Sequence, residues 1–93
     1  MFCVISFDIS DDKIRYRVVK ELKGVAVRVQ KSVFECADLR ESRFIELKKK
    51  LEKTIDKSED TVRYYFLCKG CVPRVEYSGI GGEPVRDEGF KVI

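Results

Sequence analysis

Apolar residues follow two different spacings along the first quarter of this chain. Residues Phe2 to Phe7 form a short apolar run rich in β-forming side chains, which predicts a central strand that ends at Asp8. Apolar residues then recur four apart, as on one face of a helix, at Ile14, Val18 and Leu22. Three residues ahead of them are suitable N-caps, namely Ser10, Asp11 and Asp12. Gly24 predicts the end of this helix.

The rest of the chain alternates between the same two spacings. Residues 25–36 alternate about a polar centre, which predicts two strands joined tightly near Gln30 to Ser32. Helical spacing predicts a second helix from Arg40 to Ile55. Residues Thr61 to Leu67 predict a strand, and Val72 to Tyr77 predict a last, shorter one.

The order of these elements predicts an α+β fold. A β-α-β-β-α-β chain with one additional C-terminal strand gives a ferredoxin-like sandwich, in which an antiparallel sheet carries both helices on one face. We assign residues 1–78 to this ferredoxin-like domain and residues 79–93 to a C-terminal tail of the same domain.

The other face of such a sheet would be left without cover. We expect it to expose apolar residues around Phe34 and Tyr64, and a large exposed apolar patch usually marks an interface. A homodimer that pairs the two open faces is the economical solution, with the additional C-terminal strand exchanged with, or shared with, the sheet edge of the partner.

Composition limits the chain to one small domain. Its 93 residues, 44% of them hydrophobic, suffice for a single core. No run approaches the roughly 20 apolar residues of a membrane span, and no signal peptide precedes the first strand. We therefore expect a cytoplasmic protein without a membrane partner.

Positive charge is concentrated in one segment. The net charge is only +3, yet the segment from Lys13 to Lys31 contains the single acid Glu21. Its cations are Lys13, Arg15, Arg17, Lys20, Lys23, Arg28 and Lys31. Such asymmetry is typical of phosphate or nucleic-acid binding, although a solvated helix face has the same composition.

The chain has no histidine, and this excludes several classes of site. Within one chain there can be no histidine general base, no histidine-activated nucleophile and no Cys₂His₂ zinc site. Acid–base chemistry would fall to carboxylates, Tyr, Lys or metal-bound water. Asp8 suits a Mg²⁺ ligand, because a carboxylate at the end of a strand is held by the sheet and faces solvent.

Asp8 also has a purely structural interpretation. It could cap the first helix or form an ion pair with Arg28, whereas Asp11 and Asp12 are better caps than ligands.

The cysteines divide into two groups. Cys3 and Cys36 lie in apolar runs, which is typical of buried thiols. Cys68 and Cys71 form a single CxxC motif, which is compatible with structural thiols, a local disulfide, or zinc binding or catalysis.

Several blocks together resemble the CRISPR-associated protein 2 family. These are Phe7-Asp8-Ile9-Ser10-Asp11-Asp12, Arg15 and Arg17, Gly24, the run from Arg28 to Cys36, the run from Asp60 to Tyr65, and Leu67-Cys68 with Cys71. The resemblance covers residues 1–77.

The resemblance implies a ferredoxin-like homodimer that works in the adaptation stage of CRISPR immunity. Family members bridge dimers of the CRISPR integrase during spacer acquisition. They are also described as Mg²⁺-dependent endonucleases of single-stranded RNA or double-stranded DNA.

The resemblance also assigns the site residues. It places the metal ligand at Asp8, with Mg²⁺ or Mn²⁺ as the ion, and further functional residues at Arg15, Arg17, Arg28 and Phe34. In a two-fold dimer, Asp8 and the same residue of the partner could share one ion. Many members have Tyr before the aspartate, and because this chain has Phe7, that hydroxyl is missing.

Other function classes remain open at this point. One is a non-catalytic adaptor dimer that binds the phosphates of a nucleic-acid duplex. Its binding would weaken steeply with salt and would not be lost in Asp8→Ala. Another is an RNA-recognition module, but the run from Ser32 to Cys36 lacks its Gly-rich aromatic pattern. A purely regulatory dimer would leave Asp8 and the arginines unexplained.

Overall fold

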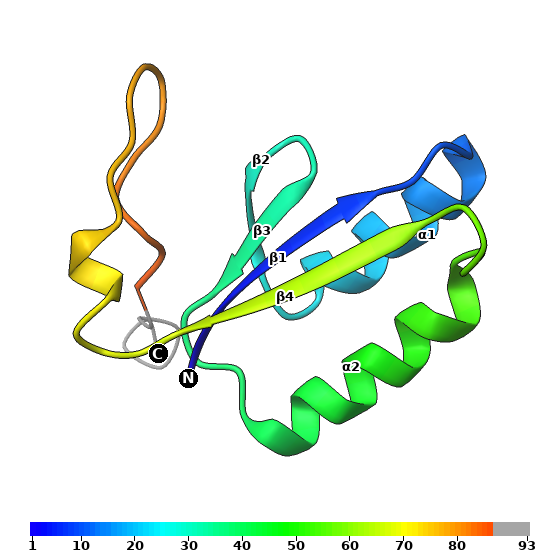
Figure 1. Ribbon diagram of the computed structural model, residues 1–93, viewed down its shortest axis with the longest axis horizontal. Helices are drawn as coiled ribbons and strands as arrows, with labels where there is room; N and C mark the ends of the chain where they lie inside the picture. The colour runs from blue at the N-terminus through cyan, green and yellow to red at the C-terminus, as the bar shows by residue number, and fades with distance from the viewer. Residues whose placement is uncertain (87–93) are drawn as a thin grey trace.

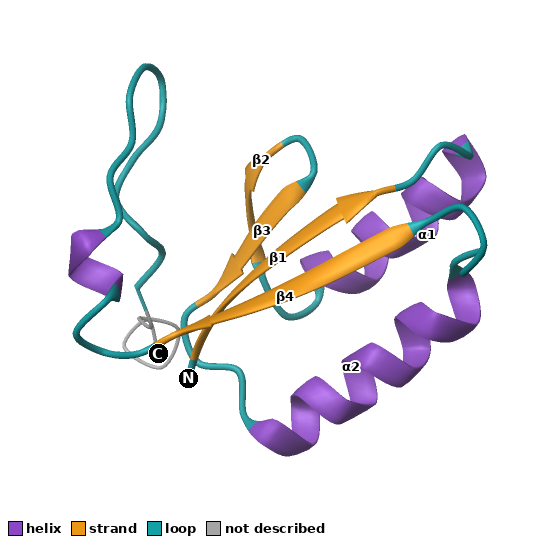
Figure 2. Cartoon of the chain, viewed as in Figure 1, coloured by secondary structure: helices purple, strands orange, loops and turns teal. Residues whose placement is uncertain are grey.

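The sheet and its two helices form the sandwich that the sequence predicts. In the computed structural model, which describes residues 1–86, a four-stranded sheet has the order β2-β3-β1-β4, and every neighbouring pair is antiparallel. Both helices lie on one side of this sheet (Figures 1 and 2). The elements are β1 (Phe2–Asp8), α1 (Asp12–Lys23), β2 (Val27–Gln30), β3 (Val33–Cys36), α2 (Glu41–Thr54), β4 (Thr61–Leu67) and a 3₁₀ turn η1 (Val72–Arg74).

Local sequence accounts for where α1 begins and ends. The Asp11 carboxylate is the N-cap, accepting hydrogen bonds from the N–H groups of Lys13 (2.8 Å) and Ile14 (2.9 Å). These bonds lower the pKa of Asp11 and satisfy two N–H groups that have no partner within the helix. Gly24 is the C-cap, as predicted.

The core lies between the sheet and the helices. Its fully buried side chains come from β1, β3 and both helices, and they are Cys3, Ile5, Val18, Leu22, Phe34 and Leu51. On β4, the rings of Tyr64 and Phe66 meet Phe44 of α2 edge-on, with centroids 5.1 and 5.0 Å apart. Truncating any one of the fully buried Leu or Ile side chains to Ala would cost about 2–5 kcal/mol.

The residues of the uncovered face differ from the prediction. Ile5 pairs with both Phe34 and Tyr64, and paired residues share a face, so both aromatics point toward the helices. The prediction that apolar residues around Phe34 and Tyr64 are exposed on the uncovered face was therefore wrong. A shift of one residue along a strand moves each side chain to the opposite face of the sheet. The uncovered face instead carries Val4, Val27 and Tyr65, of which Val27 is 52% and Tyr65 46% exposed.

The predicted strand Val72–Tyr77 does not form. The N–H groups of Arg74 and Val75 donate to the carbonyls of Cys71 and Val72, which makes the 3₁₀ turn η1. Pro73 has no N–H to donate to a sheet ladder, so it disfavours a strand here. Exchange of this segment with a partner stays a prediction.

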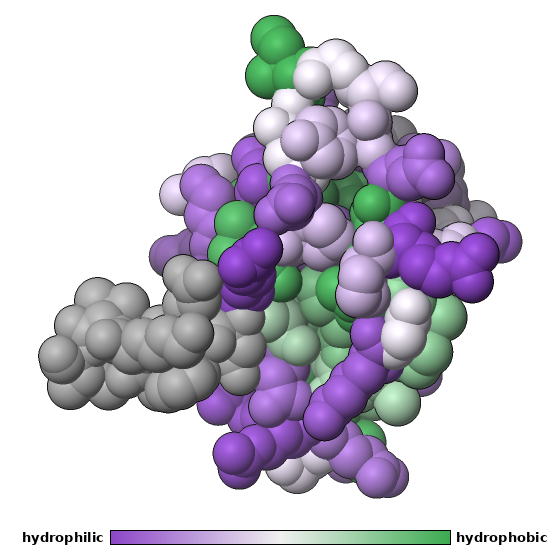
Figure 3. Space-filling model, turned by 90° about the vertical axis from the view of Figure 1, so that its left-hand side faces the viewer, coloured by the Kyte–Doolittle hydropathy of each residue, from purple (hydrophilic) through white to green (hydrophobic). Residues whose placement is uncertain are grey.

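Residues 68–86, which we call the extension, leave the sheet after β4 and then turn back (Figure 1). The Val85 N–H donates to the Glu35 carboxylate (3.0 Å), which joins the extension to β3. Apolar side chains such as Phe2 and Pro73 line a hollow of about 820 Å³ beneath the extension, on the side seen in Figure 3. Of the predicted tail, residues 87–93 lie outside the described residues.

The described residues contain no candidate for a membrane span. No helix within residues 1–86 combines the length and apolar character that crossing a bilayer requires.

Candidate metal and nucleic-acid site

Asp8 ends β1 on the uncovered face of the sheet. Alternation along β1 turns Cys3, Ile5 and Phe7 toward the helices, so Asp8 points the other way and is exposed. Within residues 1–86 its carboxylate has no hydrogen-bond or ion-pair partner.

Both structural interpretations of Asp8 are therefore wrong for this chain. Asp11 caps α1 in its place, and the Arg28 guanidinium donates to the Lys31 carbonyl through Nε (3.0 Å) and Nη2 (2.6 Å). The Asp8 carboxylate is thus available to an external cation.

Neighbours from β4 complete a shallow hollow around Asp8. The hollow has a volume of about 240 Å³, and its lining includes Ser6, Thr61 and Arg63. Register explains this grouping, because Asp8 pairs with Thr61, and Ser6 pairs with Arg63. One carboxylate, two hydroxyls and one guanidinium therefore share this corner of the sheet.

Arg63 and Tyr65 are site residues that sequence reasoning missed. Arg63 Nη1 donates a hydrogen bond to Tyr65 Oη (3.0 Å), and this bond raises the pKa of Arg63. The bond uses one guanidinium donor and leaves the others free to meet a phosphate. The available signal was the alternation Thr61, Arg63, Tyr65 along a strand that had to adjoin β1.

Arg15 lies at the same end of the sheet as Asp8. Its Nη1 donates to the Ile9 carbonyl (2.8 Å), and its Nη2 pairs with the Asp12 carboxylate. Arg15 therefore clamps the β1–α1 loop just after Asp8.

Arg17 lies on another surface. With Asp12, Lys13, Tyr16 and Lys20 it lines a hollow of about 460 Å³ on the outward face of α1, away from the buried Val18. Tyr16 is 69% exposed among these cations. We call Lys13, Tyr16, Arg17 and Lys20 the α1 stripe.

Arg28 and Phe34 form a third group. The Phe34 ring is fully buried, 6.3 Å from the Phe7 ring between centroids, and the Arg28 guanidinium carbon lies 5.7 Å from the Phe34 centroid. Phe34 is a core residue here, and direct contact between its ring and nucleic acid does not fit this placement. Phe34 would therefore contribute to a site by holding the Arg28 guanidinium in position.

A single chain offers only part of a metal site. Residues 1–86 contain no group of three or more Cys, Asp or Glu side chains that could hold an ion. Mg²⁺ commonly takes one or two carboxylates and completes its octahedron with water and phosphate. An exposed, unpartnered Asp8 fits one half of such a site, provided that a second chain supplies the other half.

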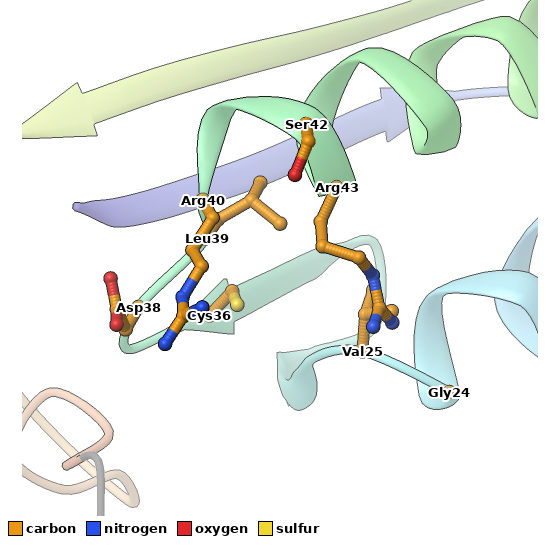
Figure 4. A pocket seen from close by; sticks show the side chains of 8 residues that line it. All are labelled: Gly24, Val25, Cys36, Asp38, Leu39, Arg40, Ser42 and Arg43. Atoms are coloured by element: carbon orange, nitrogen blue, oxygen red, sulfur yellow. The ribbon is translucent and has the colours of Figure 1, made fainter.

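A further cationic hollow lies at the start of α2. Figure 4 shows Arg40, the N-cap residue of α2, and Arg43 of its first turn beside a hollow of about 500 Å³ lined also by Val25 and Cys36. Asp38, on the rim, pairs with the N-terminal ammonium of Met1 (2.7 Å), at the end of β1 opposite to Asp8. This hollow is therefore separate from the site around Asp8.

The comparisons with known proteins identify the family and the fold. The family model described as "CRISPR associated protein Cas2" matches residues 1–75. The protein called CRISPR-associated endoribonuclease Cas2 1 of Chloroflexus aurantiacus is 39% identical over 94 residues, which cover 100% of both chains.

Solved structures share the fold. The crystal structure of Streptococcus pyogenes Cas2 matches with a TM-score of 0.76 and 32% identity, covering 85% of this chain and 100% of that one. A chain of a partial Cas6-RT-Cas1–Cas2 complex matches with a TM-score of 0.71 and 29% identity, covering 88% of each chain.

Proposed function

Because this chain belongs to the Cas2 family of CRISPR-associated proteins, we propose that it is a cytoplasmic, homodimeric, Mg²⁺-dependent endonuclease that also bridges the CRISPR integrase during spacer acquisition. The observation that carries the nuclease proposal is the exposed, unpartnered Asp8 carboxylate beside Arg63. The endoribonuclease name of the 39% identical relative makes single-stranded RNA the first substrate to test, with double-stranded DNA second.

The dimer follows from the uncovered face. Val27 and Tyr65 are about half exposed there, and the sheet has no helix on that side (Figure 2). Pairing two such faces would remove this apolar surface from water, at roughly 25 cal/mol per Å². It would also bring together surfaces that each carry an Asp8, which supplies from two chains the carboxylates that one chain lacks.

The residues around Asp8 have distinct tasks in the reaction. The paired Asp8 carboxylates would hold Mg²⁺, which when bound lowers the pKa of a coordinated water and offsets charge on the scissile phosphate. Arg63, oriented by its hydrogen bond to Tyr65, would bind a phosphate oxygen next to the scissile bond. Arg15 holds the loop after Asp8 and so keeps the carboxylate at the end of the strand.

The α1 stripe would bind the nucleic acid outside the reaction centre. Its three cations lie on one helix face and can contact successive phosphates, while the exposed Tyr16 ring offers a surface on which an unpaired base can stack. Such contacts give affinity without sequence preference, so binding should weaken steeply with salt.

The integrase role rests on the structural comparison. A chain similar to this one occurs in a complex that contains Cas1, and the CRISPR integrase is the partner that we propose for this chain. A non-catalytic adaptor dimer is the second candidate. It is favoured by Phe7, which lacks the hydroxyl that many family members have next to the aspartate.

The deciding experiment measures cleavage of labelled single-stranded RNA and duplex DNA, with Mg²⁺, with Mn²⁺ and with EDTA. Asp8→Asn keeps the shape of the side chain and removes its charge, and we expect metal-dependent cleavage to fall at least about a hundredfold. Glu59→Gln is the matched control, because Glu59 is exposed and lies in the loop before β4.

Binding must be measured on the same proteins. A salt titration of RNA and DNA affinity should give the same slope for wild type and Asp8→Asn. Cleavage at the same background level in both proteins, with or without metal and with binding intact, would reject the nuclease and leave the adaptor.

A further inference from the structure

The CxxC motif lies at the turn where the chain leaves the sheet. Cys68 directly follows β4, and its carbonyl accepts hydrogen bonds from the N–H groups of Cys71 (2.9 Å) and Val72 (3.2 Å). Cys71 is also the N-cap of η1. These bonds close one tight turn around Lys69 and Gly70, so the two cysteine side chains are brought together by the backbone.

The two sulfur atoms are close enough to react with each other. Cys68 Sγ and Cys71 Sγ form a thiol hydrogen bond at 3.0 Å, and both residues are exposed. A disulfide needs an S–S distance of about 2.05 Å, so the sulfurs must approach by about another 1 Å. Because the turn is already closed in the reduced protein, side-chain rotation can supply most of this movement.

The two thiols are chemically unequal. The hydrogen-bonded pairing with Cys71, together with backbone N–H groups of the turn, lowers the pKa of Cys68, whereas the same pairing raises the pKa of Cys71. Cys68 is thus suited to attack first, and Cys71 to attack second.

The other two cysteines serve as an internal reference for thiol reactivity. Cys3 and Cys36 are cross-strand partners in the sheet, both are buried, and burial raises the pKa of Cys3 to about 12. The predicted role of these two residues as buried thiols is confirmed. They should resist reagents that react with the exposed pair.

We propose that Cys68 and Cys71 form a reversible redox site, which small disulfides such as oxidised glutathione convert to an intramolecular disulfide. The Cys68 thiolate attacks one sulfur of the small disulfide, forming a mixed disulfide and releasing one thiolate. The Cys71 thiolate then attacks Cys68 Sγ, forms the Cys68–Cys71 bond and releases the second thiolate. The protein loses two electrons and two protons, and the small disulfide becomes two thiols.

The position of the pair gives the bond a structural consequence. The turn is the first part of the extension, whose later residues line the same hollow as Phe2 and are hydrogen-bonded to Glu35 through Val85. A disulfide across this turn would hold the Cys71 and Val72 hydrogen bonds closed. Oxidation would therefore stiffen the point from which the extension leaves the sheet.

The first test counts reactive thiols in the folded protein with a chromogenic disulfide reagent. We expect two of the four thiols to react at least about tenfold faster than the others, and all four to react in denaturant. After treatment with oxidised glutathione, mass spectrometry should show the loss of two hydrogen atoms and a Cys68–Cys71 link that dithiothreitol reverses.

Two variants separate the roles of the thiols. Cys71→Ser removes the second nucleophile, so Cys68 should retain one bound glutathione, whereas Cys68→Ser should react more slowly and form no internal link. In the oxidised wild type, amide hydrogen exchange at Cys71 and Val72 should slow at least about threefold.

Three results would overturn the proposal. They are four equally reactive thiols in the folded protein, a stable glutathione adduct on wild type without an internal link, and unchanged exchange at Cys71 and Val72 after oxidation. Protection of the two thiols by one equivalent of Zn²⁺, reversed by EDTA, together with resistance to oxidised glutathione, would replace the redox site with a metal site.

Discussion

Phe34 provides a direct test of whether a residue assigned by family resemblance acts at the site or in the core. Phe34→Ala removes a ring that is fully buried and packs near Phe7. Truncating a buried Phe costs about 3–5 kcal/mol, and losing the contact of the ring with Arg28 costs roughly another 0.5 kcal/mol. We therefore expect a loss of about 4 kcal/mol, a large share of the roughly 5–15 kcal/mol that stabilises a domain.

The assay is urea unfolding followed by circular dichroism. With a slope of about 2 kcal/mol per M, the midpoint of Phe34→Ala should fall by about 2 M. All proteins must be compared at one chain concentration, because unfolding of a dimer depends on it. Ile45→Ala is the control, since Ile45 is apolar but 45% exposed on α2, and its midpoint should move by less than about 0.5 M.

A second substitution separates packing from chemistry. Phe34→Leu keeps most of the buried volume, should cost less than about 1.5 kcal/mol, and should leave RNA cleavage within about twofold of wild type. The reasoning would be refuted if Phe34→Leu abolished cleavage while the protein remained stable, because the ring itself would then act at the site.

Two further predictions concern titration and nucleic-acid binding. Burial raises the pKa of Tyr64 from 10.0 to about 12. As the pH rises, the unfolded chain therefore loses the Tyr64 hydroxyl proton before the folded chain does. The free energy of unfolding should consequently decline between pH 10.0 and about 12. Urea titrations at each pH should show a shallower decline in Tyr64→Phe, and an identical decline would contradict the burial of Tyr64. Arg17→Ala should weaken RNA binding and reduce the salt slope of log K by about 1, whereas the exposed control Lys57→Ala should change neither; an unchanged slope in Arg17→Ala would exclude phosphate contact at the α1 stripe.

Periodicity predicted the strands and helices that carry strong local signals. The strand Thr61–Leu67 has the expected bounds, and the helix Glu41–Thr54 starts and ends within one residue of the expectation. The expected strand Val72–Tyr77 failed because its local pattern suits a strand, whereas Pro73 and the hydrogen bonds of the turn favour a 3₁₀ conformation. Local pattern is weakest where one proline decides between conformations.

The site was predictable only in part. Asp8 could be placed because the end of a strand is readable from a short apolar run, and Arg15 because it follows in the first turns of the next helix. Arg63 was not placed beside Asp8, because the alternation along its strand gives the shared face but not the register of β4 against β1, which are separated by more than 50 residues of chain.

Sequence alone was sufficient for the order of the elements from β1 to β4, the C-cap Gly24 of α1 and the absence of histidine chemistry, because each depends on neighbouring residues or on composition. Tertiary structure decided which face of the sheet each side chain occupies, and hence that Phe34 is a core residue and Tyr65 a surface one. A shift of one residue in register exchanges those faces without changing any local propensity. The tertiary structure also decided which polar groups lie together, because the Asp8 hollow forms only when the distant strands β1 and β4 pair.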